Sequence, residues 1–245
     1  MTPNQIKLVD EIKNKIDLAL VDVNKPVAAF DADGTLWPID LGESFFNYQI
    51  DQNLLPALPE EPWKHYEKLQ TIEHKSAYLW LAQVNKDHPI ETVRNWAQEA
   101  VDKNPQFSTF AFQKEIVSYL QEKNVEVYIV TASIKWAVEP GAKAYGIPQE
   151  NVIGIETMVE NNLVTDTQKG PITYREGKVK KLLEYTGGTK PFFSSGNTLG
   201  DLALLESASH VQLTVSSAPS DDRNYESEQE LKSIATKNNW YQIEG

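Results

Sequence analysis

The chain contains no cysteine among its 245 residues, which excludes disulfide and thiolate chemistry. This absence leaves the compartment open, because a protein without thiols tolerates both oxidising and reducing surroundings. The chain also lacks any stretch of about 18 apolar residues, so we expect no membrane-spanning helix. The first 22 residues mix charges with apolar residues at helical spacing and do not resemble a signal peptide. We therefore expect a cytoplasmic protein, although a removed leader would leave no trace in the sequence.

Positive charge is also scarce, because 23 Lys and Arg stand against 35 Asp and Glu, for a net charge of −12. Binding of nucleic acid or of an anionic membrane requires clustered Lys and Arg, which the sequence lacks. We expect neither partner, and the pattern predicts no particular oligomeric state. The four histidines show no metal-ligand spacing, so we expect them to be surface or packing residues.

What the chain does contain is an apolar run, Val27–Phe30, that ends in Asp31-Ala32-Asp33-Gly34. At the carboxyl end of a buried parallel strand, both aspartates would point into the crevice where open α/β sheets bind ligands. Two close carboxylates resist joint ionisation unless a cation lies between them or one holds a proton. The pair therefore indicates a metal, a nucleophile and an acid, although the same residues are also typical of a simple turn.

The segment Asp31–Leu36 resembles the first motif of haloacid dehalogenase superfamily phosphatases, and three further segments resemble the remaining motifs in order. Thr131 follows the apolar run 125–130 and matches the second motif, whose hydroxyl holds the transferring phosphoryl group. Lys178 opens an amphipathic helix and matches the lysine of the third motif better than the two lysines that follow it. The segment 136–147 is similar to that of phosphoserine phosphatase relatives, so the chain resembles the phosphoserine phosphatase-like subfamily.

The fourth motif departs from the family pattern, because Asn197 stands where an aspartate usually follows the glycine, and Asp201 comes four residues later. A neutral amide oxygen can still coordinate Mg²⁺, since its octahedral sites need only one or two carboxylates beside water and phosphate oxygens. Two arrangements stay open. Either Asn197 is the ligand, or Asp201 binds the ion directly or through water while Asn197 contacts Asp31 or the substrate.

The resemblance implies a two-step reaction in which Asp31 attacks phosphorus and forms an aspartyl-phosphate. Asp33 would first protonate the leaving alcohol and then activate water. Lys178 and Mg²⁺ would screen the repulsion between the nucleophile and the phosphate. The residues implied to contact the phosphoryl oxygens are Thr131, Ala132 and Ser133. Those implied to hold Mg²⁺ are Asp31, Asp33 through its main-chain carbonyl, Asn197 and Asp201.

The fold class expected is α/β, with a doubly wound, mostly parallel sheet like the Rossmann-type core of this superfamily. Helical patterns separate strand-like runs near 26–30, 125–130, 152–159 and 191–195. A tight hairpin is expected around Glu160-Asn161-Asn162. The acidic stretch 220–230 is expected to be a solvated loop followed by a helix start.

A helical cap is expected in the long interval between the first two strands, which contains no convincing strand. Its helical patterns lie near 43–53, 63–70, 72–86 and 89–103. A proline-rich segment at 54–62 interrupts them, and Asn104-Pro105 ends the last one. We predict a cap at 39–105, and a core domain formed by 1–38 and 106–245.

The cap is rich in aromatic residues, which we expect mainly to form its core. They are Phe45, Phe46, Tyr48, Trp63, Tyr66, Tyr78, Trp80 and Trp96. Alternatively, two or three rings face the site and hold a quaternary ammonium group by cation–π attraction. Asp40 and Glu43 lie where phosphoserine phosphatase relatives carry an acidic residue that meets the substrate's amine. Either could equally begin a helix.

We therefore predict a Mg²⁺-dependent phosphatase for a small phosphomonoester, with an amine-bearing substrate such as phosphoserine or phosphocholine as a refinement. One alternative is a phosphoester-binding protein with a weakened metal site, which only Asn197 supports. A second is a phosphotransferase of the same superfamily. A third is a dehalogenase, whose chemistry would need neither Asp33 nor a cation.

Overall fold

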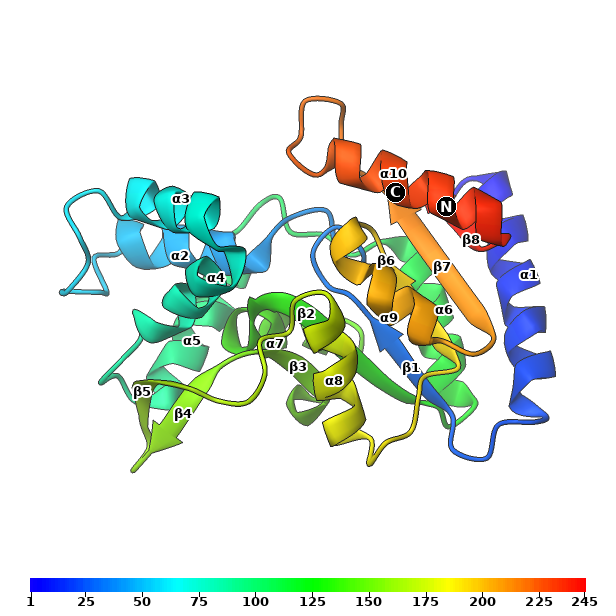
Figure 1. The fold of residues 1–245 in the computed structure, drawn as a ribbon, viewed down its shortest axis with the longest axis horizontal. Helices are drawn as coiled ribbons and strands as arrows, with labels where there is room; N and C mark the ends of the chain where they lie inside the picture. Colours follow the sequence, from blue (N-terminus) through cyan, green and yellow to red (C-terminus); the bar gives the residue numbers. More distant parts are fainter.

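A parallel sheet of six strands forms the centre of the computed structural model, which describes residues 1–245 (Figure 1). Every neighbouring pair in this sheet runs parallel, which confirms the predicted fold class. In sheet order the strands are β3 (Val152–Ile155), β2 (Glu126–Ile134), β1 (Val27–Phe30), β6 (Phe193–Gly196), β7 (Val211–Ser216) and β8 (Tyr241–Glu244).

Helices cover both faces of the sheet, which explains why β1 is a short, continuous apolar run. Ala28 and Phe30 of β1 pack in one cluster with α1 (Pro3–Leu20) and α6 (Ala111–Glu122). The alternate residues Val27 and Ala29 pack on the opposite face. That face is covered by α8 (Glu176–Tyr185) and α9 (Leu202–Ser207), and α10 (Tyr225–Asn238) connects β7 to β8.

Four helices fill the interval in which only helical patterns were found. They are α2 (Leu41–Asp51), α3 (Pro62–Ile72), α4 (His74–Gln83) and α5 (Ile90–Asp102). Figure 1 shows them together at one side of the sheet. Their apolar residues share one cluster with Ile134, at the end of β2, and Trp136, in α7 (Lys135–Lys143). The division at residues 39 and 105 stays a prediction, because this cluster joins the helices to the body of the sheet.

The strand expected at 152–159 is instead two strands, which are interrupted at Glu156 and belong to different sheets. β3 joins the parallel sheet, whereas β4 (Thr157–Glu160) pairs antiparallel with β5 (Leu163–Gln168). Asn161 and Asn162 both have positive φ, as a two-residue hairpin turn requires, which confirms the predicted hairpin. The remaining short elements are the single turns η1 (Gln149–Asn151) and η2 (Leu199–Asp201). No helix is both long enough and apolar enough to cross a membrane.

Candidate active site

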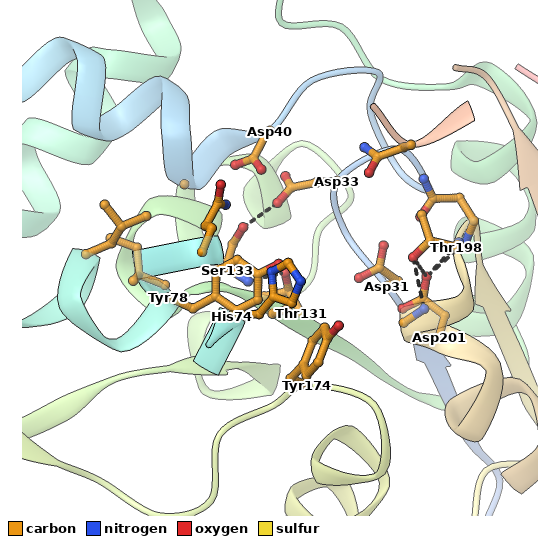
Figure 2. Close-up of a pocket in the computed structure, with 18 of the residues that line it drawn as sticks. Asp31, Asp33, Asp40, His74, Tyr78, Thr131, Ser133, Tyr174, Thr198 and Asp201 are labelled. Carbon is orange, nitrogen blue, oxygen red and sulfur yellow. Dashed lines mark hydrogen bonds between the residues drawn. The ribbon is translucent and has the colours of Figure 1, made fainter. Parts of the chain in front are cut away.

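A cavity of about 350 Å³ lies at the carboxyl ends of β1, β2 and β6. Parallel strands deliver the residues that follow them to the same edge of the sheet, so segments far apart in sequence meet here. Figure 2 shows these side chains around the cavity. The cavity is lined by all but one of the predicted site residues: Asp31, Asp33, Asp40, Thr131, Ala132, Ser133, Lys178, Asn197 and Asp201. The exception is Glu43, which lines a neighbouring cavity.

Lys178 forms ion pairs with two acids of the cavity, Asp31 and Asp201. Its Nζ lies 2.5 Å from Asp31 Oδ1 and 2.5 Å from Asp201 Oδ1, and all three side chains are buried. Burial raises the pKa of Asp31 to about 7, with Asp201 adding to the rise and Lys178 opposing it. Burial alone would lower the pKa of Lys178, but the charges of Asp201 and Asp31 raise it above its ordinary value. The lysine is therefore held as a cation beside Asp31.

Gly177 allows α8 to begin close to the preceding loop and so places Lys178. A Cβ atom at this position would lie 1.9 Å from the carbonyl oxygen of Ile172, so only glycine fits. The other two lysines of the segment point elsewhere: Lys180 is exposed, and Lys181 Nζ donates to the carbonyl oxygen of Gly154.

Asp33 is held by three donors from different elements. Its Oδ1 accepts from Trp37 Nε1 at 2.7 Å and from the backbone N–H of Leu41, the first residue of α2, at 3.0 Å. Its Oδ2 accepts from Ser133 Oγ at 2.5 Å, the bond drawn in Figure 2. Burial raises the pKa of Asp33, and the three hydrogen bonds oppose this rise. An acid with a raised pKa and a fixed orientation can hold a proton for transfer at a pH where an ordinary aspartate has lost it.

Thr131 lies in the last residues of β2, where its Oγ1 accepts from the backbone N–H of Ser133 at 3.0 Å. Its carbonyl oxygen accepts from the buried hydroxyl of Thr173. These bonds fix the end of β2, where Thr131, Ala132 and Ser133 line the cavity.

Asn197 occupies a more constrained position than the sequence indicates. Its Nδ2 donates to Glu228 Oε1 at 2.9 Å, and its Oδ1 lies 3.3 Å from Thr35 Oγ1. The same hydroxyl lies 3.0 Å from Asp31 Oδ2, so the oxygens of Asn197 and Asp31 face one another across Thr35. Gly34 permits this approach, since a Cβ atom there would lie 2.0 Å from Asn197 Nδ2.

Asp201 has both carboxylate oxygens engaged within the protein. Oδ1 accepts from Lys178 Nζ, and Oδ2 accepts from the backbone N–H groups of Asn197 at 3.1 Å and Thr198 at 3.0 Å. Asn197 Oδ1 has one long contact, to Thr35 Oγ1 at 3.3 Å, so this geometry favours Asn197 over Asp201 as the residue whose oxygen is available to a cation.

The oxygen donors near Asp31 fit Mg²⁺ in kind. No group of three or more His, Cys, Asp or Glu side chains gathers as a metal cluster. The set is instead one carboxylate, from Asp31, and one amide oxygen, from Asn197, with the chain at Asp33 beside them. Mg²⁺ prefers such hard oxygen ligands and commonly keeps several water or phosphate oxygens of its own.

Some aromatic residues of the cap line the cavity, whereas others form the core of the cap, as expected. Phe45 and Phe46 are fully buried, whereas Tyr66 and Tyr78 line the cavity. Tyr174 also lines it, with its ring 5.8 Å from that of Tyr78 (Figure 2). Burial raises the pKa of Tyr78 to about 12, so its hydroxyl stays neutral. The expectation that most cap aromatics are core is confirmed for Phe45, Phe46 and Tyr66. Tyr66 and Tyr78 also face the cavity, as the alternative expected of two or three rings.

Arg223 forms ion pairs with Asp40 and Glu43, the two acids that were expected to meet a substrate amine. Its guanidinium donates to Asp40 Oδ2 at 3.1 Å and to Glu43 Oε1 at 2.6 Å. Asp40 also caps α2, because its Oδ1 accepts from the backbone N–H of Glu43 at 2.8 Å. Asp40 therefore begins a helix, as one of the two possibilities expected, and it also lines the cavity, while its contact with a substrate amine stays a prediction.

The lining residues that the sequence analysis did not assign to the site include His74, Tyr174 and Arg223, and it also missed Glu228, which contacts Asn197 and lines the neighbouring cavity. The stretch 220–230 was expected to be solvated, and this is wrong for Glu228, which is 2% exposed. His74 is exposed, as expected, but it also lies at the cavity beside Tyr78 and Tyr174. No local pattern marks these residues, because each contacts a segment distant in the sequence.

Comparisons with known proteins agree with this geometry. A family model described as haloacid dehalogenase-like hydrolase matches residues 28–206. A phosphorylcholine phosphatase of Pseudomonas aeruginosa is 24% identical over 203 residues, which cover 65% of this chain. The aligned region spans 58% of that relative's length.

Solved structures show the same fold at low sequence identity. A protein of unknown function from Bordetella pertussis Tohama I superposes with a TM-score of 0.66 and 18% identity, covering 90% of this chain and 99% of that one. A substrate-bound phosphoserine phosphatase superposes with a TM-score of 0.52 and 15% identity, covering 88% of this chain and 99% of that one. Since the family model spans well over half of the sequence, the chain belongs to the haloacid dehalogenase-like hydrolase family.

Proposed function

We propose that the protein hydrolyses a small phosphomonoester through an aspartyl-phosphate on Asp31. The observation that carries this proposal is the buried arrangement of Asp31 against Lys178, with the triply hydrogen-bonded Asp33 two residues away. A nucleophilic carboxylate needs a nearby cation to approach an anionic phosphate, and a leaving alcohol needs a proton. Both are at hand at one edge of the sheet.

In the first step the Asp31 carboxylate would attack phosphorus, the P–O bond to the alcohol would break, and Asp33 would protonate the departing oxygen. Asp33, now ionised, would then take a proton from water, which attacks the same phosphorus and releases phosphate and free Asp31. Lys178 would offset the negative charge of the phosphoryl oxygens throughout. Thr131 and the end of β2 as far as Ser133 would orient those oxygens.

Mg²⁺ is the proposed cofactor, and when bound it would supply positive charge opposite the phosphoryl oxygens. Asp31, Asn197 and the main-chain carbonyl of Asp33 would hold it. Asp201 would act on the other side of Lys178, keeping the lysine oriented toward Asp31.

The proposed substrate class is a phosphate ester of a cationic alcohol, with phosphocholine preferred over phosphoserine. The phosphorylcholine phosphatase similar to this chain supports this choice. So does the cap side of the cavity, which is lined by three tyrosines, Tyr66, Tyr78 and Tyr174. Aromatic faces bind quaternary ammonium groups by cation–π attraction. A primary amine would instead need a free carboxylate, and Arg223 already engages Asp40 and Glu43.

The test is phosphate release from phosphocholine, phosphoserine, sugar phosphates and the isosteric ester in which carbon replaces the quaternary nitrogen, each with Mg²⁺ and with EDTA. We expect Mg²⁺-dependent release that is fastest from phosphocholine and at least about tenfold slower from the carbon isostere. Asp31→Asn should abolish turnover, whereas Asp22→Asn, which changes an exposed aspartate, should leave it intact. Ordinary turnover by Asp31→Asn would overturn the nucleophile. Equal rates for the two isosteres would overturn the substrate class.

A further inference from the structure

Glu228 is a buried carboxylate that meets no lysine or arginine. It lies in the first turn of α10 and is 2% exposed, and its carboxylate accepts every hydrogen bond that the side chain makes. Oε2 accepts from the backbone N–H groups of Ser217 and Ala218, each at 2.9 Å. Oε1 accepts from Asn197 Nδ2 at 2.9 Å. Burying an acid in this way is costly unless its hydrogen bonds are well placed.

The contact with Asn197 decides which way that amide faces. A carboxylate only accepts, so the amide group must present its NH₂ to Glu228. Its oxygen is thereby turned the other way, to within 3.3 Å of Thr35 Oγ1 and so toward Asp31. If the amide were reversed, two oxygens would oppose each other behind the site, and an NH₂ group would face the position where a cation is proposed.

We propose that Glu228 is a positioning residue that fixes Asn197 with its oxygen toward the cation site. In this pair the amide of Asn197 lies next to the cation site, and the carboxylate of Glu228 lies on the far side of that amide. This inference rests on the proposed function for its metal, but the pairing itself is a property of the folded chain. It also explains the departure in the fourth motif, because an aspartate at position 197 would place two buried carboxylates in contact.

The variants Glu228→Gln, Asn197→Asp and their combination test the pairing. In Glu228→Gln, the amide oxygen can still accept from Ser217 and Ala218, but its NH₂ group then faces Asn197 and reverses that amide. Asn197→Asp alone brings two carboxylates together. In the combination, the new amide donates to the new carboxylate, whose second oxygen faces the cation site. Glu226→Gln is the matched control, because Glu226 is an exposed acid in the same helical turn.

Two measurements read the outcome without relying on turnover: Mn²⁺ affinity by electron paramagnetic resonance, and the Tm of the metal-free protein. We expect Glu228→Gln to weaken Mn²⁺ binding about 10- to 100-fold, as loss of a residue that orients a ligand does. Adding Asn197→Asp should restore binding. Each single variant should lower Tm, and the combination should recover most of that loss, while Glu226→Gln changes neither quantity.

Additive losses in the combined variant, or unchanged Mn²⁺ binding in Glu228→Gln, would overturn the inference, because a residue that merely braces Ser217 and Ala218 gives no rescue. Failure of the proposed function looks different. In that case Tm recovers in the combined variant, so the pairing stands, but the wild-type protein hydrolyses no phosphomonoester in the substrate panel. If Tm does not recover in the combined variant and the wild-type protein binds no Mn²⁺, the positioning role is overturned as well.

Discussion

At the residue scale, Asp33 has an environment that separates its role from that of Asp31. Lys178 contacts Asp31, whereas Asp33 accepts hydrogen bonds from Trp37, Leu41 and Ser133. The raised pKa of Asp33 keeps a proton available at a pH where an ordinary aspartate has lost it. The two aspartates therefore have different neighbours although only one residue separates them.

We expect Asp33→Asn to affect substrates according to their leaving groups. Phosphocholine releases a basic alkoxide that needs a proton, so its turnover should fall about 10²- to 10⁴-fold. p-Nitrophenyl phosphate releases a stable phenolate, so the first step should survive and only the hydrolysis of the intermediate should slow. Stopped-flow absorbance should show a burst of p-nitrophenolate close to the enzyme concentration, followed by slow turnover. Equal losses in the first step for both substrates would assign the proton to another group.

At the element scale, the loop between β7 and α10 reaches across to the first turn of α2. Arg223 in this loop pairs with Asp40 and Glu43, although 183 and 180 residues of sequence separate them. Asp40, Arg223 and Asn224 line both the main cavity and its neighbour, so the ion pairs lie between the two spaces. The loop thus places a cation beside the proposed site for the substrate's ammonium group.

Arg223→Gln should favour cationic substrates over neutral ones. The change frees Asp40 and Glu43 and removes a like charge, so KM for phosphocholine should fall relative to KM for p-nitrophenyl phosphate. Because the pair is half exposed, we expect the ratio to change only about two- to fivefold. Lys237→Gln is the control, since it alters net charge equally on the exposed side of α10. If Lys237→Gln shifts the ratio as much as Arg223→Gln, net charge and not this loop controls selectivity.

The elements that sequence reasoning found are those with strong local patterns. β1 is an apolar run ended by acids, and α2 to α5 show helical spacing between prolines. β7 and β8 were not predicted. β8 is a four-residue edge strand that pairs only with β7, and only one of its residues is buried, so its sequence has no clear apolar pattern. The contacts of Arg223 and Glu228 were invisible for a related reason. Such pairs form only when the sheet brings distant loops together, and no spacing in a single sequence encodes them.

At the scale of the whole molecule, buried acids make stability depend on pH and on metal. The pKa of Asp31 is about 7 in the metal-free fold, compared with 3.8 for an ordinary aspartate. Between these values the folded protein holds a proton that the unfolded chain has released. A state that binds more protons is favoured at low pH, so the free energy of unfolding should fall as pH rises from about 4 to 7. Asp166, whose pKa is lowered, acts only below this window.

We therefore expect the Tm of the protein in EDTA to be higher at pH 5 than at pH 7.5, and Mg²⁺ to raise Tm more at pH 7.5, where Asp31 is free to bind it. Differential scanning calorimetry of Asp31→Asn isolates the contribution, because the amide cannot titrate. This variant should show a shallower fall between the two pH values and a smaller gain from Mg²⁺. If its curves run parallel to those of the wild-type protein, Asp31 is ionised in the metal-free fold, and Lys178 then outweighs the combined effects of burial and Asp201.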